Sequence, residues 1–220
     1  MNEIAVLTSG GLDSSILLAD LARTNKTHPI YIRSGLRWEN EEIDSLHNFI
    51  DDINNPFISK IVTLSIDGPS LYGQKHWSLE GEVPQYDAPD EQVYLPGRNI
   101  ILIGLAAIWC SSRNISSIFL GSLKDNPFPD ATGQFINDYS EILKCGLNKN
   151  ISIHAPYRGK NKIELIQDFK YLPLNKTMTC MQPVGMIHCN ACNKCKERRD
   201  SFTQACVEDK TKYNYEEIHE

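Results

Sequence analysis

The stretch LTSGGLDSS, residues 7 to 15, places two adjacent glycines between an apolar run and a helical pattern. The apolar run, EIAVL at residues 3 to 7, is typical of a buried parallel strand. The residues that follow the glycines, SSILLADLA, carry apolar side chains at helical spacing. A glycine loop between a first strand and a first helix therefore predicts an α/β fold, with this loop at the carboxyl edge of the sheet.

The rest of the chain continues the alternation of strands and helices. Further strands are predicted at residues 28–34, 60–66, 116–122 and 151–157, and further helices at 41–53, 98–113, 134–147 and 162–172. The irregular segments 67–97 and 123–133 interrupt this pattern, and such long loops are usually functional. The order predicts a doubly wound, mostly parallel five-stranded sheet, with ligands bound at the carboxyl ends of its strands.

Composition sets broad limits on this fold. The chain has 220 residues, 41% of them hydrophobic, so a core of normal size can form. We expect an ATP-binding α/β domain at residues 1–172 and a cysteine-rich, zinc-binding segment at 173–220. The net charge of −6 argues against nonspecific nucleic-acid binding, which needs a basic face. Without a long apolar run or a signal-peptide pattern, we expect no membrane span and a cytoplasmic location.

The glycine loop has the composition of an anion-binding site. Gly10 and Gly11 permit positive φ and a close backbone approach, so N–H groups of the loop and of the first helical turn can surround phosphate. The loop lacks the lysine of a Walker motif and the spacing of a dinucleotide fingerprint. A plain glycine turn with Asp13 or Ser14 as the helix cap would use the same residues.

The second strong signal is a cluster of cysteines near the end of the chain. Cys180, Cys189, Cys192 and Cys195 have the spacing C-x8-C-x2-C-x2-C. In a reducing compartment such a cluster indicates a metal site rather than disulfides. Four thiolates suit tetrahedral Zn²⁺, and the C-x3-C-P of ferredoxin motifs is absent. We therefore predict a closed, structural zinc knuckle.

Together, these motifs indicate a family. SGGLDSS at the start and the cysteine pattern followed by ERRDSF at the end resemble the 7-cyano-7-deazaguanine synthase family of PP-loop ATP pyrophosphatases, as a divergent branch. YLPGRNIILIGLAA and APYRGKNKIELI are similar to two further family segments, so the resemblance covers most of residues 3–206. It implies an adenine nucleotide alpha-hydrolase-like fold and a ligase of the queuosine pathway. That ligase adenylates 7-carboxy-7-deazaguanine for attack by ammonia, and a second activation gives the nitrile.

The resemblance also implies a set of site residues. Asp13, Ser14, Arg98 and Lys162 are expected to be catalytic. ATP and Mg²⁺ are expected at Leu7, Thr8, Ser9, Gly10, Gly11, Leu12, Asp13, Ser14, Ser15, Arg98 and Asn99. Zn²⁺ is expected at Cys180, Cys189, Cys192 and Cys195. From the residues alone, Arg98 and Asn99 could simply begin a helix, and Lys162 could be a solvated lysine.

Two segments depart from the family pattern. After the second strand the family usually has a tyrosine–glycine–glutamine stretch with an arginine–histidine pair, whereas this chain has SGLRWENEE. Arg37 and Glu41 could occupy the equivalent places, and Trp38 is new. Later, Ala131 stands where the family has a cysteine. These departures bear on the acceptor rather than on the ATP chemistry, so the enzyme could join a deazapurine to another amine.

The long segment 67–97 offers further candidate ligands. His76, Trp77, Tyr86 and Asp90 could line a purine-sized pocket by stacking and hydrogen bonding, or they could be surface loop residues.

Two other function classes stay open at this level. A thiolating relative would need a reactive cysteine near the loop, and Cys110 is the candidate, although Cys110 and Cys145 also fit core positions in helices. Cys206 is interpreted as a spare thiol. A nucleotide-sensing module would use the basic run KCKERR, residues 194–199, to grip a partner or RNA. Helix faces near residues 100 to 110 could pair two copies as a homodimer.

Overall fold

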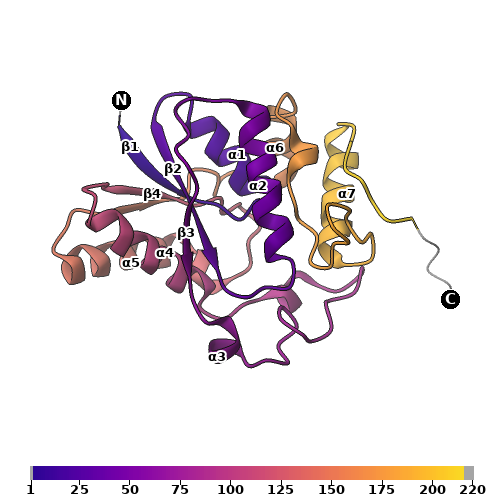
Figure 1. The fold of residues 1–220 in the computed structure, drawn as a ribbon, viewed down its shortest axis with the longest axis horizontal. Helices are drawn as coiled ribbons and strands as arrows, with labels where there is room; N and C mark the ends of the chain where they lie inside the picture. The colour runs from indigo at the N-terminus through magenta and orange to yellow at the C-terminus, as the bar shows by residue number, and fades with distance from the viewer. Residues whose placement is uncertain (1, 216–220) are drawn as a thin grey trace.

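The centre of the protein is a sheet of five parallel strands in the order β3-β2-β1-β4-β5 (Figure 1). This computed structural model describes residues 2–215. The strands are β1 (Glu3–Leu7), β2 (Lys26–Arg33), β3 (Val62–Ser65), β4 (Ser117–Phe119) and β5 (Ser152–His154). The chain order reverses between β1 and β4, which creates a topological switch point there. The predicted α/β fold is confirmed, and the sheet is entirely rather than mostly parallel.

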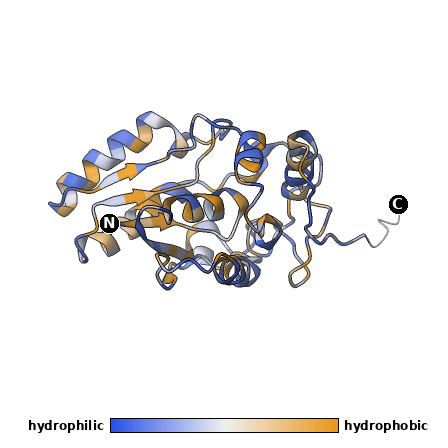
Figure 2. Ribbon diagram, turned by 90° about the horizontal axis from the view of Figure 1, so that it is seen from above, coloured by the Kyte–Doolittle hydropathy of each residue, from blue (hydrophilic) through white to orange (hydrophobic). Residues whose placement is uncertain are grey.

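Helices cover both faces of the sheet, as Figures 1 and 2 show. The helices α1, α2, α6 and α7 contribute to the core on one face, and α4 and α5 cover the other. The helices are α1 (Leu12–Leu21), α2 (Glu39–Ile53), α3 (Gly68–Tyr72), α4 (Arg98–Ser111), α5 (Gly133–Leu147), α6 (Lys162–Asp168) and α7 (Asn193–Ala205), with 3-10 turns η1 (Asp90–Val93), η2 (Pro129–Ala131) and η3 (Leu174–Lys176).

The central position of β1 in the sheet explains why this strand is apolar throughout. Ile4 and Val6 belong to the core on the α1 face, whereas Ala5 and Leu7 belong to the core on the α4 face. Successive side chains of a strand point to opposite faces, and here both faces are covered. The run therefore shows no polar alternation, as expected of a central parallel strand.

The segment 67–97, residues 36–38 and the cysteine-rich end pack against one another and form a third cluster of buried side chains. Its members are Leu36, Trp38, Val83, Val93, Leu95, Met178, Cys180, Met181, Cys192 and Cys195. The backbone N–H of Met178 donates a hydrogen bond to the Gly10 carbonyl oxygen at 2.8 Å. The cysteine-rich end therefore lies directly on the glycine loop, although the two are far apart in the sequence.

Most predicted elements are confirmed, and the misses lie in the irregular parts. The segment 67–97 contains the short elements α3 and η1, and the cysteine-rich end contains the 13-residue helix α7, which was not predicted as such. Cys110 is buried as expected, but Cys145 is exposed, so its assignment to the core is wrong. Cys206, the predicted spare thiol, is exposed.

The domain boundary after residue 172 stays a prediction. Phe202 and Ala205 of α7 share a core with β1 and α1. Pairing of two copies of the chain through α4 also stays a prediction. Ile100 and Ile108 of this helix expose apolar side chains that such pairing would cover. In the described part of the chain, no helix has the length and apolar character needed to cross a membrane.

Gly10 generates a stability prediction. Its φ is 71°, and a Cβ atom at this position would lie 2.2 Å from the carbonyl oxygen of Glu42 on α2. Gly10→Ala combines backbone strain with a backbone overlap, so we expect it to lower the free energy of unfolding by about 2 kcal/mol or more. Urea denaturation measures this loss.

Gly146→Ala is the matched control. Gly146 lies in the last turn of α5, and no heavy atom lies within 4 Å of a Cβ placed there. Alanine restricts the unfolded chain, so this variant should be more stable by about 0.5–1 kcal/mol. Equal effects of the two substitutions would contradict the close packing of α2 on the glycine loop.

Candidate active site

A cavity of about 360 Å³ lies at the carboxyl edge of the sheet, at the switch point between β1 and β4. Its size falls in the range of small-molecule sites, about 300–1,000 Å³. The lining includes these predicted site residues: Leu7, Thr8, Ser9, Gly11, Leu12, Asp13, Ser14, Arg98, Asn99 and Lys162. Gly10 and Ser15 do not line it; Gly10 packs on α2, and Ser15 is fully buried.

Hydrogen bonds within the glycine loop fix the conformation of residues 9–14. The Ser9 backbone N–H donates to Ser14 Oγ at 3.1 Å, and Ser14 Oγ donates to the Gly11 carbonyl oxygen at 3.3 Å. The N-cap of α1 is Gly11, which has no side chain to cap the helix, so the interpretation of Asp13 or Ser14 as the cap is wrong. The N–H groups of the first turn are left for a ligand, and the helix dipole favours an anion.

A chain of charged side chains joins this loop to α6 and α7. Lys162 Nζ lies 3.5 Å from Asp13 Oδ2 and also contacts Glu197. Glu197 Oε2 lies 2.7 Å from Lys194 Nζ, which lies 3.1 Å from Asp90 Oδ1. Burial raises the pKa of Asp13, whereas the two lysines outweigh burial and lower the pKa of Glu197 to about 2. Lys162 is thus a paired, largely buried lysine rather than a solvated one.

A capping box fixes the position of Lys162, the first residue of α6. Asn161 Oδ1 accepts a hydrogen bond from the Glu164 N–H at 2.9 Å, and Glu164 Oε2 accepts one from the Asn161 N–H at 2.8 Å. Both helix-end donors are therefore satisfied locally. The lysine ammonium group is aimed at the glycine loop by the helix start and held there by Asp13 and Glu197.

Two oxygen atoms of the cavity lining lack a hydrogen-bond partner within residues 2–215. Asp13 Oδ1 and Ser122 Oγ are buried and have no hydrogen-bond partner among the described residues. Buried polar atoms are normally paired, so both atoms suit a bound ligand or cation. A carboxylate oxygen is the kind of ligand that Mg²⁺ takes. Ser122, which follows β4, was not among the predicted residues.

Arg98 and Asn99 begin α4 and have different surroundings. The Asn99 backbone N–H donates to Asp130 Oδ2 at 2.9 Å, and its Nδ2 donates to the Asp130 carbonyl oxygen at 3.1 Å. Asn99 therefore ties the segment 123–133 to α4. The Arg98 guanidinium group lines the cavity and makes no side-chain hydrogen bond or ion pair with residues 2–215. Such a group can bind a carboxylate or a phosphate through two hydrogen bonds.

Glu42 is a buried acid of the cavity that was not predicted. Only 7% of the residue is exposed, and Tyr31 Oη donates to its Oε2 at 2.8 Å. Burial raises the pKa of Glu42 to about 7, although Arg98 opposes this shift. Helical periodicity could have predicted that Glu42 is buried, because it lies on the same inward face of α2 as Leu46 and Phe49.

Aromatic side chains supply the flat walls of the cavity. Trp38 stacks on Trp77 with ring centroids 5.8 Å apart, and Tyr94 stacks on Phe128 at 5.0 Å. All four residues line the cavity. Exposed faces of such rings can hold a planar heterocycle.

Apart from Trp77, the candidates for acceptor binding lie outside this lining. Of the four candidates in segment 67–97, only Trp77 lines the cavity; His76 packs beside it, and Tyr86 and Asp90 border a separate depression next to α7. The Arg37 side chain is tied to the Leu79 carbonyl oxygen at 3.0 Å. Glu41 and Ala131 do not line the cavity either.

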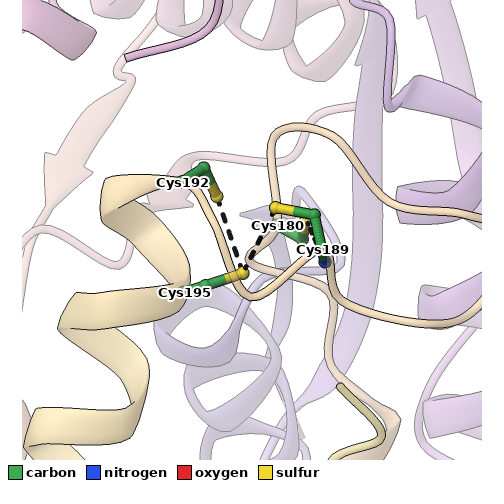
Figure 3. Close-up of side chains that lie close together, drawn as sticks. All are labelled: Cys180, Cys189, Cys192 and Cys195. Carbon is green, nitrogen blue, oxygen red and sulfur yellow. Dashed lines mark hydrogen bonds between the residues drawn. The ribbon is translucent and has the colours of Figure 1, made fainter. Parts of the chain in front are cut away.

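The four cysteines of the predicted knuckle converge, as Figure 3 shows. Their sulfur atoms all lie within 4.8 Å of one another. The sulfur of Cys195 lies 3.5 Å from that of Cys192 and 3.9 Å from that of Cys189. Tetrahedral zinc with bonds of about 2.3 Å places its sulfur ligands about 3.8 Å apart. The cluster therefore has the donor atoms and the spacing for a metal ion.

Two features that favoured other functions have structural explanations. Cys110 is buried in α4 away from the cavity lining, and burial raises the pKa of its thiol to about 12, so it is not placed as a reactive cysteine. In the basic run, Lys194 pairs with Asp90 and Glu197, Lys196 with Asp87, and Arg198 is buried. Lys194 and Arg198 are therefore used in contacts within the protein.

Glu42 predicts a pH-dependent stability. Its pKa of about 7 in the folded protein lies above the ordinary value of 4.5. Between these values the folded protein keeps a proton that the unfolded chain has released. The free energy of unfolding of the wild type minus that of Glu42→Gln should therefore decrease between about pH 5 and about pH 8. The expected decrease is on the order of 3 kcal/mol. Urea denaturation of both proteins measures this; a constant difference between them would contradict the prediction.

Comparisons with known proteins identify the family of this chain. The family model described as queuosine biosynthesis protein QueC matches residues 3–206. The 7-cyano-7-deazaguanine synthase of Methanocaldococcus jannaschii is 28% identical over 97% of this chain and 99% of its own length. The 7-cyano-7-deazaguanine synthase 1 of Desulfitobacterium hafniense is 29% identical over 91% of each chain. These names confirm the expectation of an enzyme. The chain belongs to the QueC family of queuosine biosynthesis proteins.

Proposed function

We propose that this protein is an ATP-dependent carbon–nitrogen ligase that converts 7-carboxy-7-deazaguanine and ammonia into 7-cyano-7-deazaguanine. The observation that carries the proposal is one cavity that combines the open N-terminus of α1, the Asp13–Lys162 pair and the unpaired Arg98 guanidinium group. This set has donors for phosphates and for a carboxylate. Relatives named 7-cyano-7-deazaguanine synthase that align over nearly the whole chain support the choice of substrate.

The glycine loop is the proposed phosphate site. The phosphates of ATP lie against the first turn of α1, where free N–H groups and the helix dipole stabilise negative charge. Lys162 offsets the charge that develops on the leaving pyrophosphate, as electrostatic stabilisation of a transition state requires. Mg²⁺ fits Asp13 Oδ1, which lacks a partner among the described residues, and the bound ion supplies further charge neutralisation.

The proposed chemistry has two activation steps. A carboxylate oxygen of the substrate attacks the α-phosphorus of ATP, and pyrophosphate leaves. Ammonia attacks the activated carbon, loses a proton and displaces AMP to give the amide. A second ATP activates the amide oxygen in the same way, and loss of AMP and of protons from nitrogen leaves the nitrile. Arg98 holds the carboxylate in line for the first attack, and the aromatic pairs hold the heterocycle.

The cysteine cluster is proposed to hold a structural Zn²⁺. Four sulfur donors fill a tetrahedral shell and leave no open position for substrate. Cys192 is the N-cap of α7, and Cys195 lies in its first turn. The same helix carries Lys194 and Glu197, so a metal ion that fixes its start also fixes the charges around Lys162.

Product analysis tests the function directly. The purified protein is incubated with ATP, Mg²⁺, ammonium and 7-carboxy-7-deazaguanine, and the products are identified by mass spectrometry. We expect the nitrile, AMP and pyrophosphate. AMP without nitrile would point to another amine or acid as the true co-substrate. No consumption of ATP would contradict the proposed ligase.

Asp13→Ala should lower the rate of pyrophosphate release by a factor of about 100 or more. The substitution removes the proposed Mg²⁺ ligand and leaves Lys162 paired with Glu197 alone. Asp44→Ala is the matched control, since Asp44 lies on the exposed side of α2, away from the cavity lining. A coupled pyrophosphate assay compares the two variants. Full activity of Asp13→Ala would show that the loop has another role.

Metal analysis tests the cysteine cluster. We expect one zinc ion per chain, and Cys189→Ser should lower this content and the melting temperature, because metal binding contributes to folding. Cys206→Ser is the control, since that thiol is exposed and outside the cluster. Iron and acid-labile sulfide in the purified protein, in place of zinc, would contradict the assignment.

A further inference from the structure

We infer that Glu42 determines the specificity for the heterocycle, by accepting hydrogen bonds from its pyrimidine edge, where a ring N–H and an exocyclic amino group lie side by side. The inference rests on the proposed function, because it concerns the acceptor in the same cavity. None of the residues expected from the family resemblance supplies this recognition. Glu42 belongs instead to the segment in which this chain departs from the family pattern.

The Glu42 side chain is held in a fixed position by its surroundings. Its backbone carbonyl oxygen packs on Gly10, where a Cβ atom would lie 2.2 Å away. Tyr31 Oη donates to one carboxyl oxygen at 2.8 Å, and Trp38 lines the same cavity. The carboxyl group is therefore oriented relative to both the glycine loop and the aromatic wall.

The carboxyl group has acceptor capacity that the fold does not use. In its ionised form a carboxylate has about four lone-pair sites, and Tyr31 Oη occupies one of them. The group forms no ion pair within residues 2–215, although Arg98 lines the same cavity. The remaining sites can accept two further donors from a ligand in the cavity.

The fold also has no structural need for an acid at this position. Tyr31 Oη has a second acceptor, the Glu39 carbonyl oxygen at 3.4 Å. The stripe of α2 that packs inward continues with Ser45, Leu46 and Phe49, so an apolar side chain would extend the core. Burying a carboxyl group is costly without a full set of partners. A ligand with matching donors explains why the cost is tolerated.

The proposed substrate presents such donors. The pyrimidine edge of a guanine-type base offers two adjacent N–H groups, which a single carboxylate can accept in parallel. Stacking on the aromatic wall places this edge in a defined plane. A site built around these bonds rejects an analogue that lacks one donor, because the carboxylate is then left partly unpaired.

Binding measurements without ATP test the inference separately from turnover. Calorimetry compares 7-carboxy-7-deazaguanine with the analogue that lacks the exocyclic amino group. We expect the wild type to prefer the amino compound by about 10- to 100-fold in Kd, the discrimination typical of a paired set of hydrogen bonds. Glu42→Gln, which replaces an acceptor oxygen by a donor amide, should reduce this preference to about 3-fold or less.

Two further variants separate recognition from folding. Asp44→Asn, on the exposed side of the same helix, should keep the wild-type preference. Tyr31→Phe removes the hydrogen bond from the tyrosine to Glu42 but keeps the carboxylate. We therefore expect this variant to keep most of the preference for the amino compound. It tests the inference independently if Glu42→Gln fails to fold.

The inference would be overturned by no binding of the amino compound, by no discrimination by the wild type, or by full discrimination by a folded Glu42→Gln protein. Weakened binding of ATP alone in Glu42→Gln would also overturn it, by assigning Glu42 to the nucleotide. Failure of the proposed function is a different result, namely discrimination in binding without ATP-dependent turnover.

Discussion

The contact of the Lys162 ammonium group with Asp13 and Glu197 joins three elements that are far apart in the chain. Asp13 lies in the first turn of α1, Lys162 begins α6, and Glu197 lies in α7. All three side chains are largely shielded from solvent, so removing one of them leaves the remaining charges unbalanced where water screens them poorly. This contact therefore sets where the cysteine-rich end lies relative to the glycine loop, and the geometry of the cavity depends on it.

The cavity itself follows from the sheet topology. In a doubly wound sheet the connections leave on opposite sides of the switch point, so a crevice forms between β1 and β4. The glycine loop fills one side of this crevice with N–H donors. The segment 67–97 and the cysteine-rich end close it with the third cluster of buried side chains. The cysteine cluster and the cavity are thus parts of one packed unit, connected through α7.

Particular residues show how far sequence reasoning reaches here. The strands and helices follow from periodicity, since EIAVL and the apolar stripes are local patterns. Gly11, Asp13, Ser14 and the four cysteines were predicted from motifs, and the structure brings the members of each group together. His76, Tyr86 and Asp90 were candidates for the pocket because they lie in a long loop, but they lie outside its lining. A loop without a period gives no information about which of its side chains face inward.

The sequence by itself determined the α/β class, the glycine loop between the first strand and the first helix, and the cluster of four cysteines, because each depends on residues that are close together in the chain. Only the tertiary structure decided that Lys162 is paired rather than solvated, and that Arg98 lacks a partner within residues 2–215 whereas Asn99 is bonded to Asp130. It also placed Glu42 and Ser122 in the cavity. The physical reason is that burial and charge pairing depend on contacts between distant segments, and such contacts leave no local pattern in the sequence.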